Sequence, residues 1–133
     1  MSNSENSPQK VNSFTDLRSW KKGHELILEI YKETKRFPDD EKFGLTNQLR
    51  RASVSITSNI AEGFGRSGKQ EKKNFYSTAL GSLAEVQNQL LIARDLEYLS
   101  NEAFQRLAEE TVALDKMING LIKTAGTRKN ASA

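Results

Sequence analysis

Four stretches of the chain repeat apolar residues at intervals of three and four, and this pattern restricts the fold more than any other feature. The stretches run from about residue 16 to 37, 45 to 63, 68 to 98 and 101 to 125. Such spacing places apolar side chains on one face of an α-helix, whereas strand-like alternation is not convincing anywhere. The breaks are short, so consecutive helices should pack antiparallel. The sequence therefore predicts an all-α, up-down-up-down, antiparallel four-helix bundle.

Each predicted helix has one apolar face, and the second helix has a further row beside it. The four faces comprise Leu17, Trp20, His24, Ile27, Leu28 and Tyr31; Leu45, Leu49, Ala52, Ile56 and Ile60; Phe75, Ala79, Leu83, Val86, Leu90 and Ala93; and Phe104, Leu107, Ala108, Thr111, Leu114, Ile118, Leu121 and Ile122. The further row of the second helix, Ser53, Thr57, Ala61 and Phe64, contains mostly small residues. This row suggests that the second helix has neighbours on two sides.

Capping signals precede three of the predicted helices. Thr15 or Asp16 can cap the first helix, and Ser100 can cap the fourth. Ser67 with Gln70 three residues later fits a capping box for the third helix. We therefore expect helix starts close to these residues.

Composition excludes several classes of protein. The chain has 133 residues, no cysteine and a single histidine, His24, which leaves no disulfide framework and no histidine or cysteine metal set. No apolar run approaches the ~20 residues of a membrane span, and the N-terminus does not resemble a signal peptide. We expect disordered segments at residues 1–13 and 126–133, one bundle domain at 14–125, and a cytoplasmic location without membrane contact.

The distribution of charge along the chain is more informative than its net value of +3. Residues 42–80 contain seven basic and two acidic side chains, whereas residues 81–122 contain three basic and seven acidic ones. This asymmetry is compatible with solvated helix faces, with a surface for a polyanion, or with charge-complementary packing between subunits.

The segment from Gly63 to Lys69 matches two nucleotide-binding patterns, GxGxxG and the start of a phosphate-binding loop. Both patterns require a preceding strand, and here a helix is predicted instead. The second pattern also needs Ser or Thr after the lysine, where Gln70 stands. We therefore interpret the glycines as a turn between two helices.

Basic residues surround this turn, at the start of the third predicted helix. Arg66 and Lys69 flank it, and Lys72 and Lys73 follow. A helix N-terminus attracts anions, and lysines there oppose the helix dipole, so helix stability does not explain them. These side chains either contact a phosphate or polyanion, or are simply solvated.

Two further features could indicate a site. His24 lies in the apolar face predicted for the first helix, so we interpret it as a packing residue whose exchange for Gln lowers thermal stability. The second predicted helix carries a polar row consisting of Gln48, Arg51, Ser55, Asn59 and Glu62. That row is compatible with a solvated face, an inter-subunit row of hydrogen bonds or a ligand groove. No nucleophile–base or metal set is evident, and no aromatic–basic alternation marks a platform for single-stranded nucleic acid.

The run from Phe43 to Gly63 resembles the hallmark of a bacterial four-helix-bundle family, often encoded within intervening sequences of 23S ribosomal RNA genes. Further matches are Asp16–Leu17 with Trp20, His24 and Leu26; Phe37–Pro38; residues 79–85; and residues 90–94. The resemblance covers roughly residues 14 to 125. Small departures are Ser53, where a second alanine is usual, and Ser19, where a valine is usual.

The resemblance implies a bundle that assembles into a ring, most often a pentamer. The fold is similar to that of the accessory variability-determinant protein of diversity-generating retroelements, which binds a reverse transcriptase and nucleic acid through a basic surface. The family has no established enzymatic activity and therefore offers no catalytic residues to carry over.

From these observations we expect a non-enzymatic, homo-oligomeric protein, without a cofactor, that binds RNA or DNA or acts as an accessory protein. The expected backbone phosphate contacts are Arg50, Arg51, Arg66, Lys69, Lys72 and Lys73. The alternative is a protein-interaction scaffold, for example a partner of a reverse transcriptase, without direct nucleic-acid binding.

Overall fold

The computed structural model describes residues 11–125 and confirms an all-α fold with four helices and no strand among those residues. The helices are α1 (Arg18–Thr34), α2 (Leu45–Phe64), α3 (Lys69–Asp95) and α4 (Asn101–Thr124). Two short 3₁₀ helices, η2 (Phe14–Asp16) and η3 (Asp39–Glu41), precede α1 and α2. The sequence predicted disordered segments at residues 1–13 and 126–133. Residues 1–10 and 126–133 lie outside the described residues, whereas the side chain of Val11 packs against the core.

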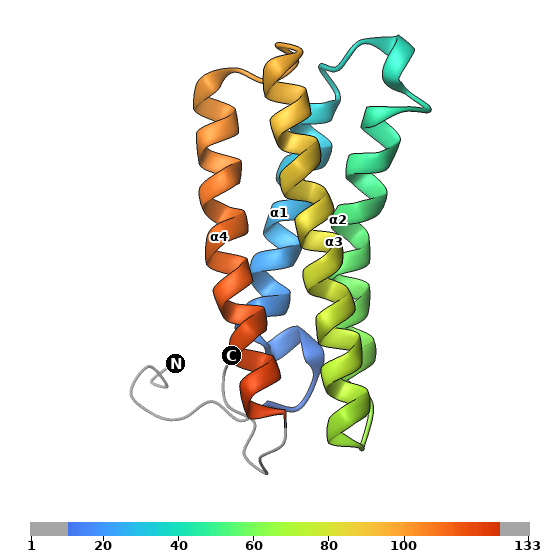
Figure 1. Ribbon diagram of the computed structural model, residues 1–133, viewed down its shortest axis with the longest axis vertical. Coiled ribbons are helices and arrows are strands. Elements are labelled where there is room, and N and C mark those ends of the chain that lie inside the picture. The colour runs from blue at the N-terminus through green and yellow to red at the C-terminus, as the bar shows by residue number, and fades with distance from the viewer. Residues whose placement is uncertain (1–10, 126–133) are drawn as a thin grey trace.

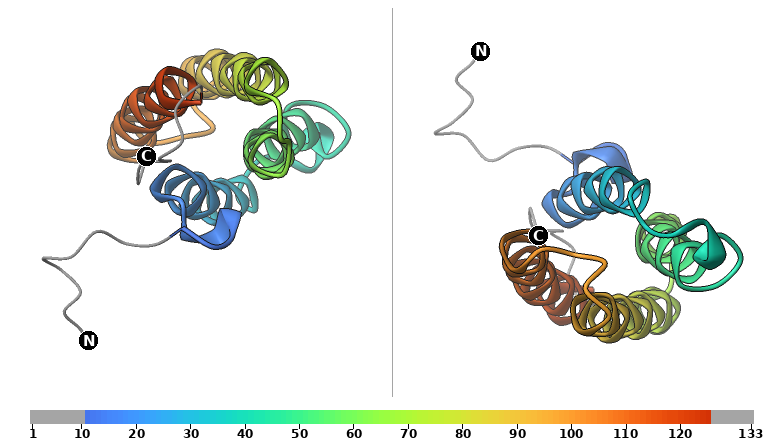
Figure 2. Two further views of the ribbon diagram at one scale, coloured as in Figure 1. Left: turned by 90° about the horizontal axis from the view of Figure 1, so that it is seen from below. Right: turned by 90° about the horizontal axis from the view of Figure 1, so that it is seen from above.

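The four helices form a bundle in which each helix contacts two neighbours. Figure 1 shows them side by side, with the α2–α3 turn at one end and the α1–α2 and α3–α4 connections at the other. The contacting pairs are α1 with α2, α2 with α3, α3 with α4, and α4 with α1. The end-on views of Figure 2 show the same order around a common centre. The α1–α2 side of the bundle therefore lies opposite the α3–α4 side.

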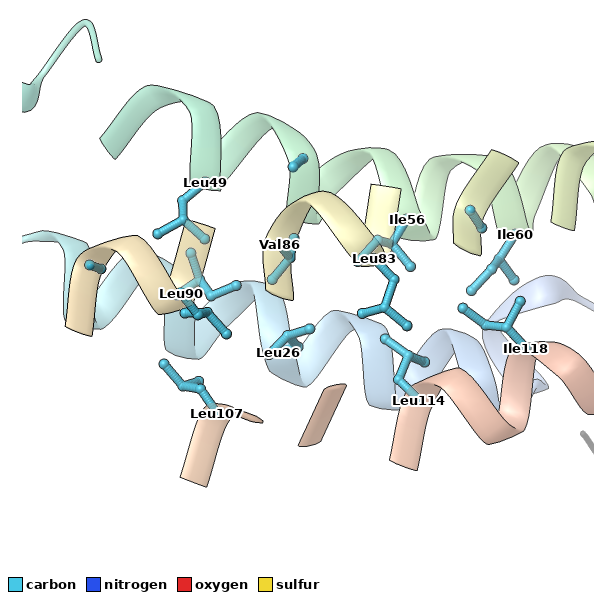
Figure 3. Close-up of a cluster of buried hydrophobic side chains, with 14 of the residues drawn as sticks. Leu26, Leu49, Ile56, Ile60, Leu83, Val86, Leu90, Leu107, Leu114 and Ile118 are labelled. Atoms are coloured by element: carbon cyan, nitrogen blue, oxygen red, sulfur yellow. The ribbon is translucent and has the colours of Figure 1, made fainter. Parts of the chain in front are cut away.

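Aliphatic side chains from all four helices fill the centre, as Figure 3 shows for Leu26, Ile56, Leu83 and Leu114 among others. Each of these four side chains is at most 1% exposed. Burial of a large aliphatic side chain contributes roughly 1.5–3 kcal/mol, so this layer supplies much of the driving force for folding. None of the helices that the structure describes combines the length and apolar character needed to cross a lipid bilayer.

The apolar face predicted for α1 is wrong for His24, Leu28 and Tyr31, which are exposed, whereas Leu17 is buried and Trp20 packs against the core. The residues that α1 buries are Ser19, Gly23, Leu26, Ile30 and Thr34. Leu28 is 58% exposed and His24 is exposed. The physical reason is the close approach of α1 to α2. A Cβ on Gly23 would lie 2.8 Å from the Thr57 methyl group, so small residues face the neighbouring helix and larger ones lie outside the contact.

The face predicted for α2 is confirmed, and its second row has a neighbour within the same chain. Leu45, Leu49, Ala52, Ile56 and Ile60 are all buried. Two members of the second row, Ser53 and Thr57, are buried as well, and Thr57 meets Gly23 of α1. This part of the row therefore serves packing inside the bundle, and it gives no evidence of contact with another subunit.

The capping signals are confirmed for one helix of three. The Ser100 hydroxyl accepts a hydrogen bond from the backbone N–H of Ala103 at 3.0 Å. At α3 the N-cap is Gly68, without a side-chain cap, so the predicted capping box is absent. The N-cap of α1 is Leu17, because Ser13 and Asp16 form a capping box around η2, one turn earlier. The predicted cap at Thr15 or Asp16 is therefore wrong.

Candidate nucleic-acid interface

Charge is unevenly divided between the two ends of the bundle. One end, formed by segments 14–22, 61–73 and 119–125 (lower in Figure 1), carries eight basic and three acidic residues. The other, formed by segments 33–45 and 92–105, carries four basic and seven acidic residues. We call these the basic end and the acidic end. A polyanion should meet a more favourable potential at the basic end.

Lys72, one of the predicted phosphate contacts, holds the α2–α3 turn together. Its ammonium donates hydrogen bonds to the backbone carbonyls of Phe64 at 2.8 Å and Gly63 at 3.3 Å. Those carbonyls belong to the last turn of α2, where a cation interacts favourably with the helix dipole. Burial lowers the pKa of Lys72. The idea that helix stability cannot explain the lysines near this turn is therefore wrong for Lys72, which stabilises the preceding helix rather than its own.

The glycine segment is a turn between helices, as predicted, and Gly63 has a packing function within it. A Cβ on Gly63 would lie 2.6 Å from the ring of Tyr76, which is buried. The absence of a side chain at Gly63 thus lets α2 and α3 approach each other closely next to the turn.

Arg50 and Arg66 are also engaged within the chain. The Arg50 Nε donates to Thr34 Oγ1 at 2.8 Å, and its guanidinium lies 4.6 Å from the centre of the Tyr31 ring. Arg66 forms an exposed ion pair with Glu62 at 2.8 Å and covers the Phe75 ring. Arg50 thereby links α2 to α1, while the Arg66 side chain remains 42% exposed at the basic end.

The other three predicted residues make no hydrogen bond or ion pair with any residue between positions 11 and 125. Arg51 and Lys69 are exposed, and Lys73 is partly buried. Lys69 and Lys73 lie in the first turns of α3 at the basic end, whereas Arg51 lies well inside α2. The structure thus brings Arg66, Lys69, Lys72 and Lys73 together around one turn and places Arg50 and Arg51 away from it.

Arg51 lines a polar groove of about 530 Å³ between α2 and α3, which we call the α2–α3 groove. Its lining residues are Phe43, Asn47, Gln48, Arg51, Ala52, Ser55, Glu85 and Gln89. Below it, the Ser55 and Ser82 hydroxyls hydrogen-bond across the two helices at 2.7 Å, and Asn59 donates to the Ser55 carbonyl at 2.8 Å. Gln48, Arg51 and Ser55 of the polar row therefore face α3, and Ser55 and Asn59 form hydrogen bonds inside the chain.

Sequence reasoning missed the aromatic ring at this groove. Phe43 is 86% exposed, the largest value among the large hydrophobic residues between positions 11 and 125. The Lys42 ammonium lies 5.6 Å from the centre of its ring. Phe43 falls between two predicted helices and belongs to neither apolar face. Its position outside both faces could have indicated that the ring is exposed.

Charged residues gather where α1 meets α4, and we call this region the charged seam. Arg106 of α4 pairs with Glu29 at 3.3 Å and with Glu33 at 3.1 Å. Burial, together with a hydrogen bond to Glu29 and the charge of Glu29, raises the pKa of Glu110 to about 7. No cluster of three or more histidine and acidic side chains suited to a metal ion occurs in the described part of the chain. The arrangement is that of a structural ion-pair network.

The fold and the charge distribution define the class: a small four-helix bundle with one basic end. A family model described as 23S rRNA-intervening sequence protein matches residues 15–120. The chain therefore belongs to the 23S rRNA-intervening sequence protein family. A solved structure from Bacteroides thetaiotaomicron, a protein of unknown function from the S23 ribosomal protein family, has the same fold. It superimposes with a TM-score of 0.71 and 23% sequence identity, over 80% of this chain and 99% of that one. Comparison with curated proteins gives no match.

Proposed function

We propose that this chain is a non-enzymatic, cytoplasmic protein whose antiparallel bundle assembles into a homopentameric ring and binds RNA or DNA through the basic end. The observation that carries the proposal is the separation of charge, with eight basic and three acidic residues at one end. Lys69 and Lys73, which no ion pair within residues 11–125 neutralises, supply its cations for phosphate contact. Arg18, Lys21 and Lys22 at the start of α1 extend the same end.

Ring assembly is supported by apolar residues exposed on opposite sides of the bundle. Leu28 and Tyr31 of α1 and Val54 of α2 are 38–58% exposed. On the α3–α4 side, an apolar groove of about 180 Å³ is lined in part by Leu91 and Val112, which are 42% and 52% exposed. Two different apolar surfaces on opposite sides favour head-to-tail contacts, which close into a ring when the rotation permits.

A ring would repeat a modest basic surface several times. Each subunit offers few phosphate contacts, but linked subunits bind one polymer with avidity. Backbone contacts of this kind carry no sequence information, so binding should differ little between sequences. The alternative is a protein scaffold that contacts a partner, such as a reverse transcriptase, and makes no contact with nucleic acid.

Salt dependence of binding tests the proposal. Labelled RNA and DNA are titrated with wild type and with the double variant Lys69→Gln/Lys73→Gln at several salt concentrations. Each lost contact should reduce the slope of log affinity against log salt by about 0.9 on duplex DNA and by about 0.7 on single strands. The matched control, Lys32→Gln/Lys35→Gln, removes the same charge near the acidic end and should keep the wild-type slope. Lys72 is left unchanged because it holds the turn.

Two outcomes would overturn parts of this proposal. If wild type binds no nucleic acid at low salt, the scaffold alternative replaces nucleic-acid binding. If both double variants change the slope equally, binding is not confined to the basic end and that assignment is overturned. Light scattering separately tests assembly, since a concentration-independent mass near 14.9 kDa would exclude the ring. Val112→Asp should lower the mass of the assembly if the α3–α4 groove lies in a subunit contact.

A further inference from the structure

We propose that the α2–α3 groove binds an unpaired base of single-stranded nucleic acid, with Phe43 as the stacking platform and Arg51 as the contact to the adjacent phosphate. This inference rests on the proposed nucleic-acid binding and adds a second site to it, away from the basic end. It identifies the preferred ligand as a single strand rather than a duplex.

The exposure of Phe43 is the first observation. A large aromatic side chain that is 86% exposed contributes little to the fold. The ring also lines the α2–α3 groove. The Lys42 ammonium lies over one face of the ring, so the other face is available to a planar ligand that enters from the groove.

The loop that carries Phe43 is held in place by a neighbouring residue. The Glu41 carboxylate accepts hydrogen bonds from the Leu45 backbone N–H at 2.9 Å and from the Tyr98 hydroxyl at 3.0 Å. The first bond satisfies the start of α2, and the second ties the loop to the segment that follows α3. Glu41 thereby fixes the loop on both sides, so the ring is presented to solvent by a rigid support.

The polar lining of the groove is the second observation, and it favours a base over an apolar protein segment. Asn47, Gln48 and Gln89 contribute side-chain amides, and Gln89 Oε1 is buried without a hydrogen-bond partner in the described chain. Amides both donate and accept, as base edges do, and the Glu85 carboxylate can accept from an exocyclic amino group. A protein contact would call for a more apolar centre than this lining provides.

Charge at the groove supplies the third observation. Arg51 is exposed and makes no ion pair with residues 11–125, and the Lys42 ammonium lies 5.6 Å from the Phe43 ring centre. Two cations, the Glu85 carboxylate and a set of amides around one aromatic ring match a nucleotide, which combines a phosphate, a planar base and polar edges. In a duplex the base faces are already stacked, so only an unpaired base can use the ring.

The test separates stacking from phosphate contact. Wild type and Phe43→Ala are titrated with a labelled 12-nucleotide DNA strand and with an abasic strand of the same length, which keeps the phosphates but has no bases. Phe43→Ala should weaken binding of the intact strand about tenfold and leave the abasic strand unchanged. Arg51→Gln should weaken both strands by a similar factor, because it acts on the backbone.

Two matched variants control for indirect effects. Phe43→Trp should retain binding of the intact strand, because indole also stacks on bases. Leu96→Ala removes another apolar residue, which is 51% exposed and does not line the groove, and it should bind like wild type. Circular dichroism and light scattering confirm that fold and mass are unchanged in each variant.

The two proposals fail in distinguishable ways. If wild type binds intact and abasic strands equally, with the salt dependence expected of phosphate contacts, nucleic-acid binding stands and the base site is overturned. If Phe43→Ala changes the mass of the assembly while wild-type binding strength persists, Phe43 is a subunit contact and the base site is again overturned. If wild type binds no strand at low salt, both proposals fall.

Discussion

Helix α1 contacts its two neighbours by different means. Toward α2 the contact is close and mostly uncharged, with Gly23 against Thr57 and with the Thr34 hydroxyl accepting a hydrogen bond from Arg50 at 2.8 Å. Toward α4 lies the charged seam, where Arg106 reaches two glutamates at 3.1 and 3.3 Å.

Because of this difference, the two contacts should respond differently to salt and pH. Close packing of small and aliphatic groups depends little on salt or pH, because it relies on shape and apolar burial. Partly exposed ion pairs contribute roughly 0–1 kcal/mol each and vary with ionic strength and protonation. The α1–α2 contact therefore fixes the bundle, whereas the charged seam adjusts its stability to conditions. The predictions below test this contrast.

The largest effect should come from the buried face of α1. Leu26 is fully buried, so Leu26→Ala should lower the free energy of unfolding by about 3 kcal/mol through lost burial and a residual cavity. Leu28 is 58% exposed, and Leu28→Ala should lower it by no more than about 0.5 kcal/mol. Urea denaturation at one fixed protein concentration measures both. Equal losses would mean that the face of α1 is placed wrongly.

The next effect concerns adjacent arginines with different environments. Arg50→Gln removes the hydrogen bond to Thr34 and the contact with the Tyr31 ring, and it should cost about 1 kcal/mol. Arg51→Gln removes an exposed charge of the same kind and should change stability by less than about 0.5 kcal/mol. Thermal denaturation of the two variants side by side is the measurement. A larger loss for Arg51 would contradict the distinction between a structural and a solvent-facing arginine.

The extent to which the sequence predicted this fold depended on side-chain size. The aliphatic residues of α2 stand at helical spacing with polar residues between them, and their face was predicted correctly. On α1 the aromatic residues formed the more obvious row, while the buried face contains Ser19 and Gly23. Small residues indicate that two helices approach closely only when the neighbouring helix is known. The spacing of apolar residues alone therefore favoured the wrong face of α1.

The candidate site was less predictable, because it depends on partners far apart in sequence. A lysine near a helix start gives no indication that its ammonium reaches the carbonyls of the preceding helix, as Lys72 does. Likewise, Arg50 and Arg51 are neighbours in sequence, but only Arg50 faces α1. The alignment of Phe43 with the Gln89 amide of α3 in one groove also arises only after folding.

The charged seam predicts a pH dependence of smaller size. The pKa of Glu110 rises from its ordinary value of 4.5 to about 7, chiefly through burial and then through Glu29, while Lys22 and Arg106 oppose the shift. The folded state therefore holds a proton that the unfolded state has lost between these values. The stabilisation of the folded state by this bound proton is fully present below pH 4.5 and is lost as pH rises through 7.

Measurement of unfolding between pH 5 and 8 tests this linkage. Wild type should lose on the order of 1 kcal/mol across the range, a figure reduced from the full shift because Glu110 is partly solvated. Glu110→Gln cannot ionise and should show a flatter profile with higher stability at pH 8. The control Glu109→Gln alters the exposed neighbour and should retain the wild-type profile. A profile of Glu110→Gln as steep as that of wild type would place the titrating group elsewhere.

The smallest effect should come from His24, for which the sequence predicted a packing role. The imidazole is exposed and stacks on the Trp20 indole, with ring centres 4.8 Å apart and an angle of 14° between the planes. A stacked pair contributes roughly 0.5–1.5 kcal/mol, and solvent exposure places this pair at the lower limit. His24→Gln should therefore lower stability by about 0.5 kcal/mol and leave nucleic-acid binding unchanged, while the Trp20 fluorescence reports loss of the stack. A loss near that of Leu26→Ala would show that His24 is buried after all, and a loss of binding at full stability would assign the histidine to a site.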